Sequence, residues 1–354
     1  MTWVPYKDDF ESEWDEFVKI NPNGRFVYLI GFKKAIEEIY NLKSNYWLCY
    51  EDGKIKAVFP SFFHRSVLYG KRIVSQPFSE YGGILFSTDI DIEKKIKILK
   101  EFNSVIENTF KEKYLDYLEI RCFSDLKGLN NNLFEKVPLY YYGILKLDRN
   151  LNLSKLVDYS VRKNIKKAIR NNLKVVAGNS EVEIKNIFYP LHLKSLKRLG
   201  SPPQPLEYFL SLQKNLKDYI KIFFAKYKEN YISALLGWTV GDSAHITDIS
   251  SDEKYFDLRG NDLIHYEFIK WAAENGYKYF DFGPVRYPGQ RQYKVKWGIS
   301  LLEYSNYYLS VKKIKKPLSD KSYFVKIGSG LWKLIVPVKL SAKIGKYFRK
   351  ELSI

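Results

Sequence analysis

The stretch that decides the fold runs from Asn261 to Phe282 and reads NDLIHYEFIKWAAENGYKYFDF. Its first part predicts a helix from about Asn261 to Asn275, and Gly276 is the residue type that ends helices in a left-handed conformation. A predicted strand from Tyr277 to Phe282 follows at once. A helix that leads directly into a strand is typical of α/β folds.

The residues before this stretch predict three strands joined by tight turns. A strand Tyr219–Tyr227 continues through Glu229-Asn230 into a second strand, and Gly241-Asp242 then turns the chain into Ala244–Ser250. The order is therefore hairpin, strand, helix, strand.

The same order occurs once more, earlier in the chain. Asp52-Gly53 joins two predicted strands, Asn45–Tyr50 and Lys54–Phe63. Next come a short strand, a helix with apolar residues at helical spacing, and a strand, at Arg72–Ser75, about Asp91–Lys113 and Leu115–Cys122. The final strands of the two parts look alike, a likeness that two amphipathic strands also show by chance. We predict an α/β (α+β) fold of two similar domains with mixed central sheets flanked by helices, covering residues 1–147 and 148–310, followed by a basic segment, 311–354.

The positive charge is concentrated in two segments. The net charge is +18. Residues 154–174 hold seven Lys/Arg and one acid, a local +6, and residues 312–350 hold twelve and one acid, a local +11. Such patches favour polyanionic partners, such as a pyrophosphate-bearing substrate, tRNA or an acidic membrane surface. A lysine-rich codon usage equally explains the high count.

Composition excludes several classes of protein. With 354 residues, 45% of them hydrophobic, the chain is long enough for about two domains with proper cores. Two cysteines, Cys49 and Cys122, cannot form a disulfide framework or a four-thiolate zinc site. The sequence contains no apolar run of about 20 residues, so we expect a cytoplasmic protein that does not cross a membrane.

A basic helix is predicted between the two domains, from Ser160 to Arg170. Its apolar residues form one stripe, while Arg162, Lys166 and Arg170 form a row on the other side. Anion binding and a solvated surface explain this row equally well.

Several short segments, in this order, resemble the FemAB-like and BioF2-like branch of the GNAT-fold acyltransferases. They are Gln76–Gly83, Tyr117–Arg121, Val161–Arg170, Phe188-Tyr189, Arg198–Pro202, Tyr208-Phe209, Phe280–Gly283 with Gly289, and Tyr293–Gly298. The resemblance implies two GNAT-like halves around a cleft and transfer of an acyl or aminoacyl group to an amine of a cell-envelope precursor. The acceptor would be a peptidoglycan-type peptide or a surface polysaccharide, either small or lipid-linked and carrying phosphate. No bound cofactor is implied, and the acyl donor would be an aminoacyl-tRNA or an acyl-CoA.

The resemblance also assigns roles to residues. Lys294, after Tyr293, would stabilise the negative charge that develops on the carbonyl oxygen, a role that a fixed cation suits. Arg198 would bind a substrate phosphate, as a guanidinium can. With them we expect Arg162, Lys166, Arg170 and Tyr293 to bind substrate, while Tyr81 and Asp281 line the acceptor cleft as catalytic candidates. Asp248 is a further candidate to accept the proton that the amine must lose.

Departures from the family pattern leave two alternatives open. Arg121-Cys122 stands where aminoacyl-transferring relatives carry Asp-Pro, and the usual acetyl-CoA signature is missing; its nearest trace is Arg286–Arg291. One alternative is an acyl-CoA-dependent N-acetyltransferase of an amino sugar or other small amine, and the other is a non-catalytic RNA-binding protein. The four histidines show no metal-binding spacing, so no metal is expected.

The basic segment at residues 311–354 has an apolar centre around Trp332. An amphipathic, lysine-rich segment of this kind can rest on an anionic membrane surface. The resemblance instead implies that it packs on the first domain. Pro337 divides it, because a proline interrupts a continuous helix.

Overall fold

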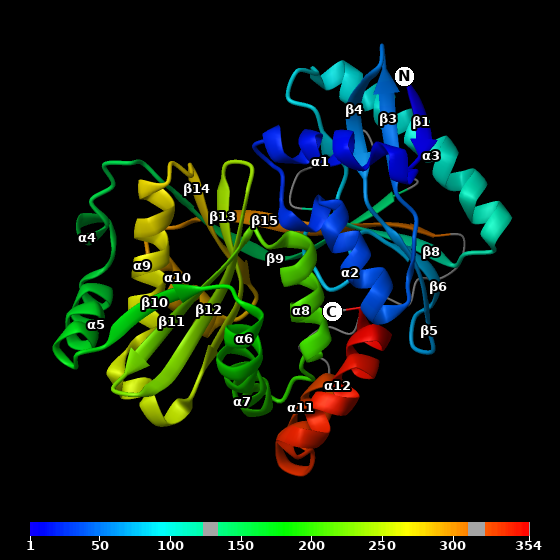
Figure 1. Ribbon diagram of the computed structural model, residues 1–354. Coiled ribbons are helices and arrows are strands. Elements are labelled where there is room, and N and C mark those ends of the chain that lie inside the picture. Colours follow the sequence, from blue (N-terminus) through cyan, green and yellow to red (C-terminus); the bar gives the residue numbers. More distant parts are fainter. Residues whose placement is uncertain (123–133, 311–322, 354) are drawn as a thin grey trace. The chain divides into compact units, whose positions relative to one another are not determined.

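The computed structural model describes residues 1–122, 134–310 and 323–353, which form two compact units (Figure 1). Unit 1 comprises Met1–Tyr141, Glu303–Pro317 and Lys350–Ile354, and unit 2 comprises Tyr142–Leu302 and Leu318–Arg349. The described part of the basic C-terminal segment is thus divided between the units. Residues 311–322 of that segment, with five of its lysines, lie outside the described residues.

Unit 1 contains a small antiparallel sheet, a mixed sheet and three main helices. The small sheet has the order β1-β3-β4-β7, and the strands of the mixed sheet that lie in unit 1 include the run β15-β8-β6-β5-β2, in which β6 and β8 are parallel. The elements are β1 (Thr2–Pro5), α1 (Glu11–Ile20), α2 (Ile30–Tyr40), β2 (Lys43–Ser44), β3 (Trp47–Glu51), β4 (Lys54–Phe59), β5 (Phe62–Ser66), β6 (Gly70–Val74), β7 (Leu85–Phe86), α3 (Ile92–Lys113) and β8 (Tyr117–Cys122). Two longer strands, β9 (Phe134–Lys146) and β15 (Ser300–Ser310), have residues in both units.

The sequence pattern of unit 1 explains these elements and one deviation. Asp91 begins α3, because its carboxylate accepts a hydrogen bond from the Lys94 N–H. The predicted single strand Lys54–Phe63 was wrong: the structure divides it into β4 and β5. The break falls at Pro60, which has no N–H to donate to a strand ladder.

Unit 2 is built on the strand order β10-β11-β12-β13-β14. Its strands are β10 (Lys174–Gly178), β11 (Ile220–Tyr227), β12 (Asn230–Val240), β13 (Ser243–Ser251) and β14 (Tyr279–Val285). Its helices are α4 (Leu153–Leu156), α5 (Tyr159–Arg170), α6 (Glu181–Glu183), a π-helical turn (Ile184–Phe188), α7 (Tyr189–Leu199), α8 (Leu206–Leu216), α9 (Gly260–Glu274), α10 (Pro288–Val295), α11 (Tyr323–Ile335) and α12 (Val338–Leu352).

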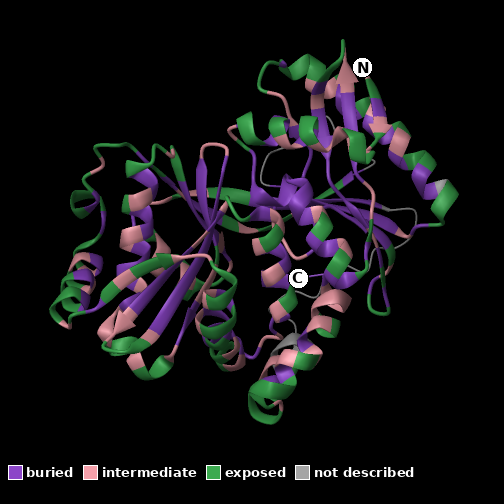
Figure 2. Cartoon of the chain, viewed as in Figure 1, coloured by how far each residue is buried: buried purple, intermediate pink, exposed green. Residues whose placement is uncertain are grey.

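Helices cover both faces of this sheet. Ile249 packs into the core beneath α9, whereas the preceding residue, Asp248, contacts His192 on α7. Because consecutive strand residues point to opposite faces, α7 and α9 lie on opposite sides of β13. Figure 2 shows β11, β12 and β13 buried along most of their length, whereas β10 is exposed or intermediate.

Candidate active site

The strands β13 and β14 pair only over their first three residues, and each strand continues beyond this paired region. Their parallel pairing joins Ser243 to Tyr279, Ala244 to Phe280 and His245 to Asp281. Beyond it, β13 contains a bulge at Thr247, because Gly237 on β12 faces Ile246 and Leu236 faces Asp248. A bulge bends its strand and re-aims side chains, and bulges are frequent beside active sites.

Lys294 lies beside the second half of β14. Its ammonium group donates hydrogen bonds to the carbonyl oxygens of Phe282, at 2.5 Å, and of Pro284, at 2.8 Å. α10 carries this lysine in its last turn. The structure therefore fixes a cation on the backbone edge of the strand that follows the paired region.

Asp281 is wholly buried and supports the same strand from within. Its carboxylate accepts a hydrogen bond of 2.8 Å from the N–H of Gly283, which has a φ of +70°. Glycine adopts this left-handed conformation without strain. The contact assigns Asp281 a role in shaping β14, and its catalytic role stays a prediction.

Tyr293 and His265 hold α10 against α9. The Tyr293 hydroxyl lies 3.3 Å from His265 Nδ1, and the His265 ring stacks on Phe282 and packs against Trp297. His265 Nδ1 also lies 2.7 Å from the Asn261 carbonyl oxygen, which can only accept, so Nδ1 carries the proton. Burial lowers the pKa of His265 to about 4, so the ring is neutral. Tyr293 thus positions α10 and Lys294, and its predicted contact with substrate is not tested.

On the opposite face, Asp248 forms a polar group that sequence patterns reveal only in part. Its two carboxylate oxygens bind His192 Nδ1, at 2.8 Å, and the Ser250 hydroxyl, at 2.5 Å. Burial raises the pKa of the Asp248 carboxyl, but the electrostatic interaction with His192 and the two hydrogen bonds outweigh it, so the pKa is lowered. The Asp248 side chain keeps 17% of its surface exposed. It is therefore an ionised carboxylate that solvent can reach.

Sequence analysis missed His192, which lies on α7, fifty-six residues away from Asp248. The ring of His192 is packed among Phe188, Tyr189 and Phe209. The only sequence signal for this group is the spacing of Asp248 and Ser250, because residues two apart in a strand share a face. Nothing in the sequence indicates which helix covers that face.

Arg198 lies over the segment that connects β13 to α9. Its guanidinium carbon is 5.0 Å from the centre of the Phe256 ring, and the side chain is exposed at the end of α7. This connection ends at Gly260, where a Cβ atom would come within 2.5 Å of the Ser233 hydroxyl oxygen. Only glycine allows this close approach. The exposed guanidinium of Arg198, held over Phe256, is able to bind a phosphate.

The predicted basic row on α5 is only partly exposed. Arg162 donates to the carbonyl oxygens of Ser154, at 3.1 Å, and Val157, so part of its guanidinium closes the turn that precedes the helix. Lys166 and Arg170 are exposed. Phosphate binding by this row stays a prediction.

Tyr81 belongs to unit 1, where only 2% of it is exposed and the Arg25 guanidinium lies 5.6 Å from its ring centre. Its predicted place in the acceptor cleft stays a prediction. Among the described residues, no cluster of His, Cys, Asp and Glu could hold a metal ion. No helix in this part of the chain is both long and apolar enough to span a bilayer.

Comparison with protein families decides what kind of domain unit 2 contains. Residues 159–295, from the start of α5 to the end of α10, match the model of the acetyltransferase (GNAT) domain. The chain carries a GNAT domain. Lys294, Asp281, Asp248 and Arg198 all lie within the matched region. A sequence comparison with curated proteins finds no match.

Solved structures share the fold of most of the chain. FemX is similar with a TM-score of 0.66 and 15% identity, covering 86% of this chain and 97% of FemX. The C-terminal domain of a protein named as a lysylphosphatidylglycerol synthetase, from Agrobacterium fabrum, has a TM-score of 0.56 and 11% identity over 85% of this chain and 92% of that one. A tandem GNAT protein from the clavulanic acid biosynthesis pathway has a TM-score of 0.52 and 7% identity over 89% and 99%.

These comparisons confirm the predicted fold class, and the domain match confirms the GNAT part of the predicted resemblance. With FemX the chain shares the fold. With its GNAT domain, the protein is an acyltransferase.

Proposed function

We propose that the protein transfers an acyl or aminoacyl group to an amine of a phosphate-bearing precursor of the cell envelope. One observation carries the proposal: Lys294 holds its ammonium group on the β14 carbonyl oxygens, just beyond the paired part of β13 and β14. A fixed cation stabilises the oxyanion of a tetrahedral intermediate more than the neutral carbonyl, and this difference lowers the barrier.

The acceptor amine needs an anionic group that orients it and accepts the proton that it loses. Asp248 suits this role better than Asp281, because it keeps exposed surface whereas Asp281 is wholly buried against the Gly283 N–H. His192 and Ser250 fix both oxygens of the Asp248 carboxylate, so the charge is held in place before the substrate arrives. In this scheme His192 is a positioning residue.

Phosphate groups of the substrate would bind the exposed cations of the same domain. Arg198 above Phe256 is one, and Lys166 and Arg170 on α5 are others. The names of two structural neighbours, FemX and a lysylphosphatidylglycerol synthetase, support a precursor of the cell envelope, the second with a lipid acceptor. The donor in this proposal is an aminoacyl-tRNA or an acyl-CoA.

Replacement of Lys294 tests the proposal. Lys294→Met should lower kcat by about a hundredfold or more, because the oxyanion loses its cation. Lys296→Met is the matched control, since Lys296 is exposed and only two residues away. Circular dichroism should show both variants folded. Equal rates for Lys294→Met and the wild type would overturn the role of Lys294.

The donor is identified by offering labelled acetyl-CoA and a charged tRNA pool separately, with amine acceptors. Transfer from charged tRNA alone supports an aminoacyl transferase, and transfer from acetyl-CoA alone supports an N-acetyltransferase. Binding of tRNA without transfer from either donor would overturn the proposal in favour of an RNA-binding protein.

A further inference from the structure

The helices α11 and α12 expose apolar side chains that a folded protein ordinarily buries. Ile327, Leu331, Leu334 and Ile335 follow one another at helical spacing on α11, with 41%, 50%, 83% and 68% of each exposed. Val338, the first residue of α12, continues the row. Such a stripe normally faces a core or a partner.

The opposite side of the helix pair is the side that packs on unit 2. Trp332 is 7% exposed and contacts Phe348 at 5.1 Å between ring centres. The Lys197 ammonium donates hydrogen bonds to the carbonyl oxygens of Trp332 and Val336 and so caps the C-terminal end of α11. On α12, a Cβ at Gly345 would lie 2.4 Å from the Pro203 carbonyl oxygen. The apolar row is therefore free of the contacts that hold the pair in place.

The charged residues along the apolar row are positive, and Glu351, near the end of α12, accepts hydrogen bonds from the Ser66 hydroxyl and the Leu68 N–H instead. Residues 323–350 contain seven Lys/Arg and no Asp or Glu. Lys333, Lys339 and Lys343 are exposed on the same two helices. Figure 2 colours most of the α11–α12 pair, including the turn that joins the two helices, as exposed or intermediate.

We propose that the apolar row of the α11–α12 pair, with the lysines beside it, lies on an anionic lipid surface. Leucine and isoleucine side chains enter the boundary between headgroups and acyl chains, and the lysines contact lipid phosphates. An RNA would neutralise the lysines but leave Leu334 and Ile335 in water. The lipid surface satisfies both kinds of side chain, and it requires no helix that crosses the bilayer.

Binding to a lipid surface would bring the GNAT domain to a lipid-linked acceptor. This consequence rests on the proposed function, whereas the binding itself does not. The binding itself needs no catalysis and is measured without donor or acceptor. Failure to bind vesicles and failure to transfer an acyl group are thus separate results.

Vesicle sedimentation tests the proposal. The full chain should sediment with vesicles of phosphatidylcholine and phosphatidylglycerol, and at least about tenfold less with phosphatidylcholine alone or in high salt. The double variant Leu334→Asp/Ile335→Asp should lose at least about tenfold of this binding. Both side chains are exposed, so the variant should keep the wild-type thermal unfolding.

Val182→Asp is the matched control, because Val182 on α6 is 65% exposed, close to the 68% of Ile335, but lies beside Glu181 and Glu183. It should bind vesicles like the wild type. Absence of wild-type binding, or unchanged binding by the double variant, overturns the proposal. A wild-type dimer that the double variant converts to a monomer also overturns it, because a second copy would then cover the row.

Discussion

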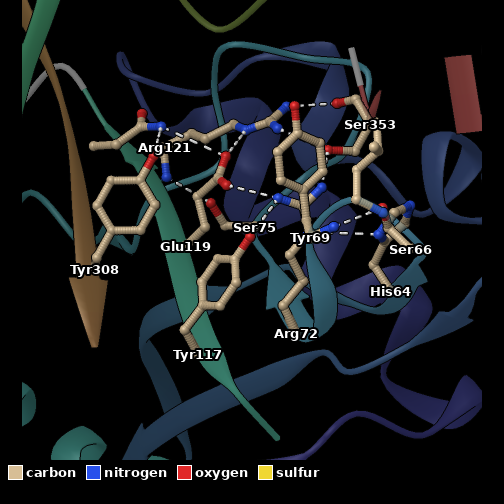
Figure 3. A network of polar contacts seen from close by, with 12 residues as sticks. His64, Ser66, Tyr69, Arg72, Ser75, Tyr117, Glu119, Arg121, Tyr308 and Ser353 are labelled. Atoms are coloured by element: carbon tan, nitrogen blue, oxygen red, sulfur yellow. Dashed lines mark hydrogen bonds and ion pairs between the residues drawn. The ribbon is translucent and has the colours of Figure 1, made fainter. Parts of the chain in front are cut away.

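Both units bury charged groups, but they pair them differently. In unit 1, Glu119 is 1% exposed and binds two buried arginines, Arg72 at 3.2 Å and Arg121 at 2.7 Å (Figure 3). Every nitrogen of both guanidinium groups has a hydrogen-bond partner, including the Ser353 side chain. In unit 2, by contrast, Asp248 pairs with His192, whose Nε2 is buried without a partner among the described residues.

The difference separates a structural network from a candidate site. A buried ion group whose members satisfy one another has nothing left to offer a ligand, and its removal is costly. Asp248 keeps exposed surface, and the buried Nε2 of both His192 and His265 lacks a partner in the part of unit 2 that the structure describes. An ionised carboxylate that keeps exposed surface beside a strand bulge therefore locates the candidate site better than buried charge does.

The largest expected effect on stability belongs to unit 1. Glu119→Gln leaves two buried arginines without their anion and should lower the free energy of unfolding by about 3–5 kcal/mol. Urea denaturation measures it. Glu229→Gln, at a surface pair whose glutamate side chain is 94% exposed, should change the free energy by less than about 1 kcal/mol. Equal decreases in the free energy of unfolding of the two variants would contradict a larger contribution of the buried charges to stability.

The second effect belongs to unit 2 and should appear in catalysis. Asp248→Asn keeps the size of the side chain but removes its charge, so kcat/KM for the amine acceptor should fall about tenfold or more. His192→Gln should shift the pH dependence of the reaction, because His192 helps to lower the pKa of Asp248. Wild-type activity in Asp248→Asn, with Glu119→Gln inactive although folded, would reverse the assignment of the two networks.

A third effect concerns one histidine in each unit. Burial lowers the pKa of both His64 and His265 to about 4, against about 6.5 in an unfolded chain. Between these values the unfolded chain binds more protons, so this part of the stability is complete above about pH 6.5 and decreases as the pH falls toward 4. The slope should be about 1.4 kcal/mol per pH unit for each histidine.

Urea denaturation at several pH values measures this slope. His64→Asn and His265→Asn should each reduce it, in unit 1 and unit 2 respectively. A wild-type stability that does not change across this pH range would contradict the neutral state of both rings.

The smallest effect is expected for Tyr293→Phe. Its hydroxyl lies at the long distance of 3.3 Å from His265 Nδ1, while its ring remains packed against His265 and Trp297. Unfolding free energy should fall by about 1 kcal/mol or less. A loss of activity as large as that of Lys294→Met would instead show that the Tyr293 hydroxyl contacts substrate, as the sequence analysis predicts.

Local signals in the sequence predict most of the fold. Gly276 and the periodicity before it predict α9 to within one residue at each end, and Asp91 predicts the start of α3. Pro60 has an equally local effect, although the continuous run of apolar residues around it suggests a single strand. Each of these signals acts within a few residues, so a single sequence reveals it.

The sites depend on contacts that no local signal carries. Lys294 is found through a resemblance, and its two carbonyl partners depend on the left-handed Gly283. The pairing of His192 with Asp248 depends on which helix covers which face of the sheet. Asp281 is a candidate catalytic carboxylate in the sequence, and only the structure reveals its burial and its hydrogen bond from the Gly283 N–H.

The return of residues 350–353 to unit 1 has a consequence for how the protein is made. Arg121 bonds to Ser353, which is 232 residues later in the chain. At ordinary rates of protein synthesis, roughly 10–50 s separate the two residues. All of unit 2 is synthesised in that interval, while Glu119 and its arginines still lack one of their partners. The part of the molecule that leaves the ribosome first is therefore the part whose folding is completed last.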